Sequence, residues 1–134
     1  MIDVFTFLFT ICMLSIVVNL GISLYGVLYK PSLIKKIISL TIFSDSANIT
    51  AIIIGYVRWR NPGEIAPPVL LNPNPTLEDI EEFAKVAVDP LPQALVLTAI
   101  VIGLAVTLFL VFLTLQIYRF YGTTDVRRIA KLKG

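Results

Sequence analysis

The sequence predicts an all-α membrane protein that crosses the bilayer three times. Three long apolar segments fill most of the 134 residues, and 57% of all residues are hydrophobic while 15% are charged. A soluble domain of this size is about a quarter charged and leaves much of its surface in water. The chain therefore has more apolar surface than a water-soluble core could bury, and the bilayer is its natural solvent.

Each apolar segment is long enough to span the hydrocarbon core, which a helix of about 20 residues crosses. The predicted helices cover residues 4–28, 37–57 and 92–118. Pro31 follows the first segment, and proline cannot continue a helix. The N-terminus lacks the basic residues of a secretory signal peptide, so the first segment is predicted to stay as a span. Residues 1–134 are predicted to form a single membrane domain.

The basic residues predict an N-terminus outside the cell and a C-terminus inside. Eight of the 11 Lys and Arg residues lie between the first two spans or in the tail, residues 119–134. The loop at residues 58–91 instead combines Arg58, Arg60 and Lys85 with a majority of carboxylates. Lys and Arg concentrate on the cytoplasmic side of membrane proteins. We therefore expect a multi-pass protein of the cell membrane with an outer loop at 58–91 and a cytoplasmic tail.

The outer loop is predicted to contain a short amphipathic helix. Thr76-Leu77-Glu78-Asp79 has the pattern of an N-cap followed by acids in the first turn. From Leu77 to Ala87, the apolar residues share one helical face and the charged residues the other. We expect this helix to lie on the outer membrane surface or on a partner subunit. Its acidic face can steer cations, although we favour a simply solvated face.

Asp45 is the only charged residue within the three predicted spans. It lies about 12 Å from the predicted start of its helix. A charge near the bilayer centre costs about 2.5–3.5 kcal/mol on insertion scales, so a partner, water or protonation must offset it. Thr41, Asp45 and Asn48 share one helical face, with Ser44 beside them. We interpret these four residues as candidates for a hydrated cation or proton path.

The first and third spans carry small and polar residues at helical spacing. Asn19 and Ser23 lie one turn apart in the first, and Ala99, Gly103 and Thr107 form a small-xxx-small ridge in the third. Such residues let membrane helices approach closely and hydrogen-bond to one another. We favour a packing role for both sets.

The residue inventory provides no active site. The chain has no histidine and one cysteine, Cys12, which we interpret as a small hydrophobe in its span. Ser-His and Cys-His pairs are therefore excluded, and a zinc site is not expected. The basic residues flank spans and form no nucleic-acid footprint. We expect no metal, no cofactor and no nucleic-acid partner, and any redox chemistry would belong to other subunits.

The third span begins with a motif that resembles a known family. Asp89-Pro90-Leu91-Pro92-Gln93-Ala94-Leu95-Val96-Leu97-Thr98-Ala99-Ile100-Val101-Ile102-Gly103 is similar to the signature of the C subunit of Mrp-type sodium/proton antiporters. That subunit is the counterpart of the K subunit of complex I. The segment from Ile38 to Asn48 resembles the second-helix motif of the same family. The resemblance covers about Val4 to Tyr121.

The resemblance implies a three-helix subunit that packs between larger antiporter-like subunits. The parent assembly would be a free antiporter, or an archaeal respiratory complex with a hydrogenase or a sulfur-reducing enzyme. The K subunit of complex I carries glutamates at the positions that match Thr41 and Gly103 here. We expect Asp45, one turn after Thr41, to provide a substitute acid on the same face.

Three functions follow from these patterns. The first is a subunit of a multisubunit complex that moves Na⁺ or H⁺, in which this chain contributes to the hydrophilic ion axis. The second is a structural scaffold without an ion path, in which Asp45 pairs with a neighbouring subunit. The third is a quinone-linked K subunit, and the residues at Thr41 and Gly103 argue against it.

Overall fold

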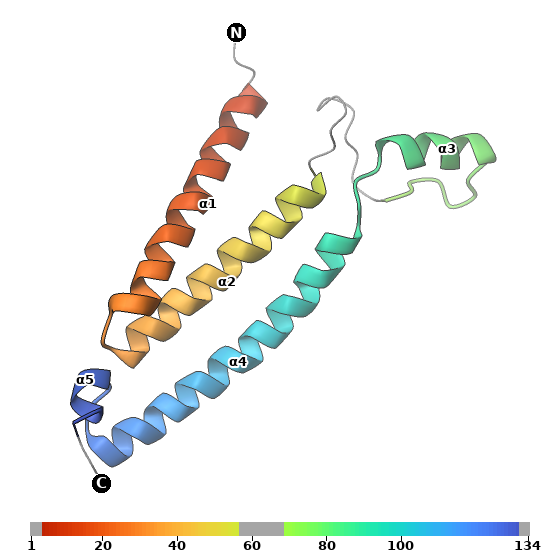
Figure 1. The fold of residues 1–134 in the computed structure, drawn as a ribbon. Helices are drawn as coiled ribbons and strands as arrows, with labels where there is room; N and C mark the ends of the chain where they lie inside the picture. The colour runs from red at the N-terminus through yellow and green to blue at the C-terminus, as the bar shows by residue number, and fades with distance from the viewer. Residues whose placement is uncertain (1–3, 57–68, 132–134) are drawn as a thin grey trace.

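A computed structural model describes residues 4–56 and 69–131 of the chain. Three long helices account for most of it: α1 (Val4–Tyr29), α2 (Leu33–Tyr56) and α4 (Leu91–Tyr121). Each is long and apolar enough to cross a membrane. A short helix, α3 (Leu77–Val86), stands between α2 and α4, and α5 (Val126–Ile129) lies in the tail (Figure 1). The all-α fold with three spans is therefore confirmed.

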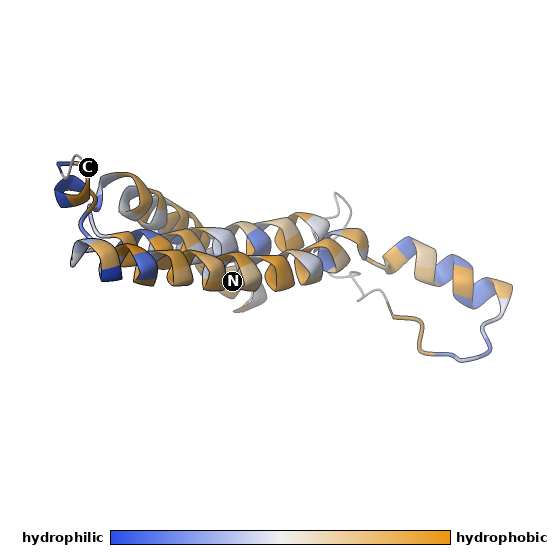
Figure 2. Ribbon diagram, turned by 90° about the horizontal axis from the view of Figure 1, so that it is seen from below, coloured by the Kyte–Doolittle hydropathy of each residue, from blue (hydrophilic) through white to orange (hydrophobic). Residues whose placement is uncertain are grey.

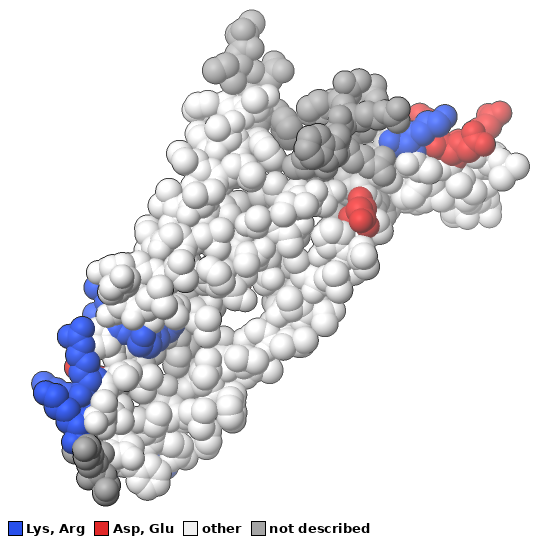
Figure 3. All heavy atoms as spheres, viewed as in Figure 1, with Lys and Arg blue, Asp and Glu red and all other residues white. Residues whose placement is uncertain are grey.

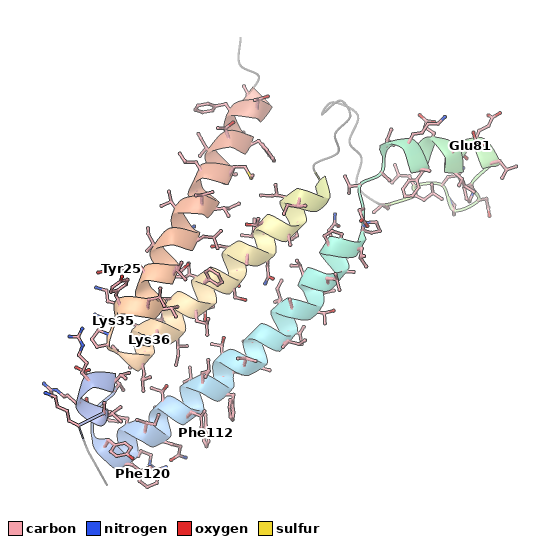
Figure 4. The ribbon with its side chains drawn as sticks, in the orientation of Figure 1. Tyr25, Lys35, Lys36, Glu81, Phe112 and Phe120 are labelled. Carbon is pink, nitrogen blue, oxygen red and sulfur yellow. The ribbon has the colours of Figure 1, made fainter. Side chains whose placement is uncertain are left out.

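The start of α2 differs from the prediction. The helix begins at Leu33, before the predicted start at residue 37, so Lys35 and Lys36 lie in its first turn. The Lys36 ammonium group donates a hydrogen bond to the backbone carbonyl of Val27, and Figure 4 shows Lys35 and Lys36 beside the α1–α2 turn. A lysine's long apolar stem allows this position at a helix end. Asp45 consequently lies about 18 Å from the start of α2, near the middle of the helix.

α2 is the central helix, because it packs against α1 on one side and α4 on the other (Figure 1). The three spans are mostly hydrophobic along their length (Figure 2). Most of their large aliphatic and aromatic side chains are exposed, where a bilayer would cover them. None of the buried residues among those described is larger than valine or threonine: Ser23, Gly26, Ser46, Ala87, Val88, Val96 and Thr114. Membrane helices associate through residues of this kind, because lipid tails solvate large apolar side chains as well as a neighbouring helix does.

Two glycines mark close approaches between the spans. A Cβ atom on Gly26 of α1 would overlap the Ser39 hydroxyl of α2 and lie 2.8 Å from the Ser39 Cβ. A Cβ atom on Gly55 of α2 would lie 2.9 Å from Cγ of Pro92 of α4. The first contact lies near the α1–α2 turn and the second at the opposite end of α2. These contacts fix where the helices meet.

The tail folds back onto the α1–α2 turn. Backbone hydrogen bonds run from Leu33 N to Thr124 O and from Val126 N to Pro31 O, each at 3.0 Å. Asp125 then caps α5 by accepting a 2.9 Å hydrogen bond from Arg127 N. The helix α5 was not predicted, because a single turn is too short to show a periodic pattern.

The charged residues separate to opposite ends of the structure, as Figure 3 shows. Lys and Arg gather around α5 and the α1–α2 turn, while Asp and Glu gather around α3. This separation agrees with the distribution on which the orientation was predicted. Some residues used for that prediction lie outside the described residues: Asp3, Arg58, Arg60, Glu64 and Lys133.

The predicted amphipathic helix is present as α3, with the predicted cap. The Thr76 hydroxyl accepts a 3.3 Å hydrogen bond from Asp79 N, and the Asp79 carboxylate accepts a 2.9 Å bond from Thr76 N. The Asn72 amide donates a further 3.1 Å bond to the same carboxylate. The backbone N–H of Thr76, then its hydroxyl and the Asn72 amide, lower the pKa of Asp79 below its ordinary value.

Gly26→Ala should lower the stability of the protein by about 1–3 kcal/mol, the usual cost of overpacking, because the new methyl group meets Ser39. Gly21→Ala is the matched control, since a Cβ there has nothing within 4 Å and alanine favours a helix. The midpoint of thermal unfolding in detergent measures both. Ser39→Gly should restore the stability of the Gly26→Ala variant, and a failure to do so would mean that the clash lies elsewhere.

The α3 cap should weaken in acid. The pKa of Asp79 is lowered in the folded state, so the ionised carboxylate stabilises the fold. This stabilisation is complete above the ordinary carboxyl pKa of about 3.9 and is lost as the pH falls through the lower pKa of the folded state. Hydrogen exchange of the α3 amides, corrected for intrinsic rates, should accelerate as the pH falls below the ordinary carboxyl pKa of about 3.9. Asp79→Asn should remove most of this pH dependence. An unchanged dependence in that variant would contradict the assignment.

Candidate functional site

The polar face of α2 and the small-residue ridge of α4 line one groove. Its volume is about 650 Å³. All four candidates for an ion path border it from α2, and the three ridge residues border it from α4: Thr41, Ser44, Asp45 and Asn48, with Ala99, Gly103 and Thr107. The space-filling view shows the helices parting between α2 and α4 (Figure 3). The fold thus brings together two patterns that lie more than fifty residues apart in the sequence.

Most polar side chains of the groove have no hydrogen-bond or ion-pair partner among the described residues. Ser44, Asp45 and Asn48 form no side-chain hydrogen bond or ion pair with any described residue. Thr41 donates a 3.1 Å hydrogen bond to Ile37 O, which leaves the lone pairs of its hydroxyl available. Asp45 itself is exposed. These oxygens are therefore available to water, a cation or a neighbouring subunit.

The α4 ridge does not pack closely against α2 at the level of Asp45. A Cβ atom on Gly103 would have nothing within 4 Å. The small residues instead leave room beside the carboxylate. Thr41 and Gly103, the positions that the resemblance matches to glutamates, both border this groove together with Asp45. The helix-packing role expected of the ridge stays a prediction.

The groove continues toward the α3 end of the spans. A second hollow of about 420 Å³ shares Asn48 and Ala99 with the groove and reaches Asp89, just before α4. One Asp89 oxygen accepts a 2.9 Å hydrogen bond from Leu91 N, and the residue is exposed. In the sequence, Asp89 is one carboxylate of the outer loop and the first residue of the family motif. Its place at the mouth of this hollow depends on the α2–α4 contact, which the sequence pattern does not reveal.

Toward the α5 end the lining changes. The hollow between α2 and α4 at that end, about 460 Å³, is bordered mainly by aliphatic side chains and contains no charged residue. Its polar residues are Thr114, Tyr118 and Thr124, and the Thr114 hydroxyl donates a 2.8 Å bond to Leu110 O. Charged residues therefore line the space between α2 and α4 at Asp45 and toward the α3 end, and not at the α5 end.

The first-span candidates lie away from the groove. Ser23 is buried between α1 and α2 at 1% exposure and donates a 3.0 Å bond to Leu20 O. Asn19 and Cys12 are exposed on α1. A packing role for Asn19 would need a surface outside this chain and stays a prediction. No group of three or more potential metal-ligating residues occurs in the described part of the chain.

Comparisons with known proteins cover the helices that form the groove. A family model described as NADH-ubiquinone/plastoquinone oxidoreductase chain 4L matches residues 8–134. The chain is 36% identical over 106 residues to Na(+)/H(+) antiporter subunit C1 of Staphylococcus aureus strain JH9, across 79% of this chain and 80% of that protein. The same protein of strain Newman matches equally.

One solved structure is also similar. It belongs to the membrane-bound sulfane sulfur reductase, an archaeal respiratory membrane complex, one chain of which aligns with a TM-score of 0.66 at 32% identity. The alignment covers 92% of this chain and 97% of the other. Both the sequence and the arrangement of the three spans are therefore shared with subunits of multisubunit membrane assemblies.

Proposed function

The chain belongs to the NADH-ubiquinone/plastoquinone oxidoreductase chain 4L family, and on that premise we propose that it lines a cation or proton path between α2 and α4. It is a small multi-pass membrane subunit of an Mrp-type antiporter or complex I-like assembly. Its partners are other membrane subunits. The transported ion that we propose, Na⁺ or H⁺, is one of the two named for the Staphylococcus aureus antiporter.

The position of Asp45 carries the proposal. The carboxylate lies near the middle of α2 and borders a groove with room beside it. It has no partner among the described residues, so the cost of its charge must be offset from outside the chain. A carboxylate that exchanges a proton or a cation with water meets this requirement, and intramembrane acids commonly mark such paths.

The other residues of the groove have roles that suit an ion. Hard cations bind oxygen ligands, and Thr41, Ser44 and Asn48 present hydroxyl and amide oxygens on the face of Asp45. Asn48 links the groove to the hollow that ends at Asp89. The acidic residues around α3 lie at that same end and attract cations. The ion would therefore exchange with the α3 side, and a neighbouring subunit would continue the path beyond the groove.

Asp45→Asn tests the proposal because it removes the charge while keeping the size of the side chain. Ion transport by the complex should fall by about tenfold or more, as the loss of a charge-assisted interaction of about 1.5–3 kcal/mol implies. The measurement is sodium-dependent proton movement in membrane vesicles. Asp45→Glu should retain part of the rate. Asp125→Asn is the matched control, since Asp125 caps α5 outside the groove and asparagine keeps the acceptor.

The outcomes separate transport from scaffolding. Normal assembly with slow transport supports the ion path. Normal transport in the Asp45→Asn variant contradicts it. Loss of the neighbouring subunits from the purified complex would instead assign Asp45 to an intersubunit contact and favour the scaffold function.

We further propose that the α3 end faces outward and the α5 end faces the cytoplasm, on the basis of the separated charges. The single cysteine makes a direct test simple. In a Cys12→Ser background, Glu81→Cys on α3 should react with a membrane-impermeant maleimide in intact cells, and Arg128→Cys on α5 should react only after the membrane is opened. Both residues are exposed. The opposite labelling pattern would reverse the orientation.

A further inference from the structure

The helix α3 presents apolar side chains that are largely exposed and that no other described segment covers. Leu77 is 82% exposed and Ile80 is 45% exposed, and both lie on the apolar face of the helix. Leu71, in the extended segment that leads out to α3, is 92% exposed. Figure 1 shows that this segment and α3 together project away from the three spans. We call Leu71, Leu77 and Ile80 the α3 patch.

The α3 patch is held in place from both ends of the helix. At the start, Thr76 and Asp79 form the reciprocal cap, and Asn72 ties the preceding segment to it. At the end, Ala87 and Val88 are buried at 6% and 2% exposure. A surface that is ordered before binding loses less conformational entropy when a partner covers it. The cap and the buried end therefore order the projecting helix before any partner binds.

The charge of α3 distinguishes between two kinds of partner. The helix carries four carboxylates, Glu78, Asp79, Glu81 and Glu82, against one basic residue, Lys85. Helices that lie on membrane surfaces usually have polar faces rich in Lys and Arg, which anionic lipid headgroups attract. The polar face of α3 is mainly acidic instead and lacks the basic residues that attract such a helix to headgroups. The partner that fits both faces is a protein.

We propose that the α3 patch docks onto a neighbouring subunit of the complex, on a surface with an apolar centre and a basic rim. The apolar centre covers Leu71, Leu77 and Ile80. The basic rim faces Glu81, which follows Leu77 by one turn and is exposed (Figure 4). Complementary rim charges speed association and fix register. This contact is separate from the groove and stands whether or not Asp45 carries an ion.

A photoreactive cross-linking residue tests the contact in the intact complex. Incorporated in place of Leu77, it should give a product with a subunit that co-purifies with this chain, and the cross-linked peptide should contain apolar and basic residues. The matched control replaces Glu82, which lies on the opposite face of the same helix. A product with lipid or with a second copy of this chain, equal products from both positions, or no product would each overturn the proposal.

Charge reversal gives a second, independent measurement. Glu81→Lys should reduce the cross-linking yield from position 77 by at least severalfold at low salt, because the rim would then repel the partner. Glu82→Lys makes the same chemical change on the far face and should leave the yield nearly unchanged. Equal effects of the two substitutions would contradict a basic rim. Sodium-dependent transport is assayed in parallel, so that failure of the contact and failure of the groove remain distinguishable.

Discussion

A carboxylate near the middle of a membrane-spanning helix imposes the main physical constraint on this molecule. On insertion scales the charge of Asp45 costs about 2.5–3.5 kcal/mol, and no described residue of the chain compensates it. The helix that carries it is nevertheless the central one, in contact with both other spans. The fold therefore places its least lipid-compatible group beside a groove rather than against lipid alone, and it leaves the compensation to water, an ion or a neighbouring subunit.

The groove exists because the spans meet at particular places and separate elsewhere. Gly26 brings α1 against Ser39 near the α1–α2 turn, and Gly55 brings α2 against Pro92 at the other end. At the level of the groove α4 leaves space beside α2, where a Cβ atom on Gly103 would have nothing within 4 Å. Small residues thus have two opposite effects here. They allow close packing where backbones converge, and they provide room where the backbones do not.

The sequence predicts those features that depend on local pattern. Apolar length gives the three spans, and the Thr76–Asp79 spacing gives the α3 cap. Features that depend on contacts between distant segments are not predictable in this way. The lysines at the start of α2 resemble a flank until the Val27 carbonyl is seen to accept the Lys36 hydrogen bond. Likewise, the contact between Gly55 and Pro92, and hence the place of Asp89 at the end of the groove, appears only in three dimensions.

If Asp45 carries the ion as proposed, the same geometry accounts for an acid that has shifted within the family pattern. The two positions that the resemblance matches to glutamates, Thr41 and Gly103, border one groove, and Asp45 borders it one turn farther along α2. An acid moved by one helical turn stays on the same face. Glycine on the opposing wall adds space rather than a second charge. With a single carboxylate in the groove, any relay that needs two titrating groups must take the second from another chain. The ion path that we propose is therefore a property of the interface and not of this subunit alone.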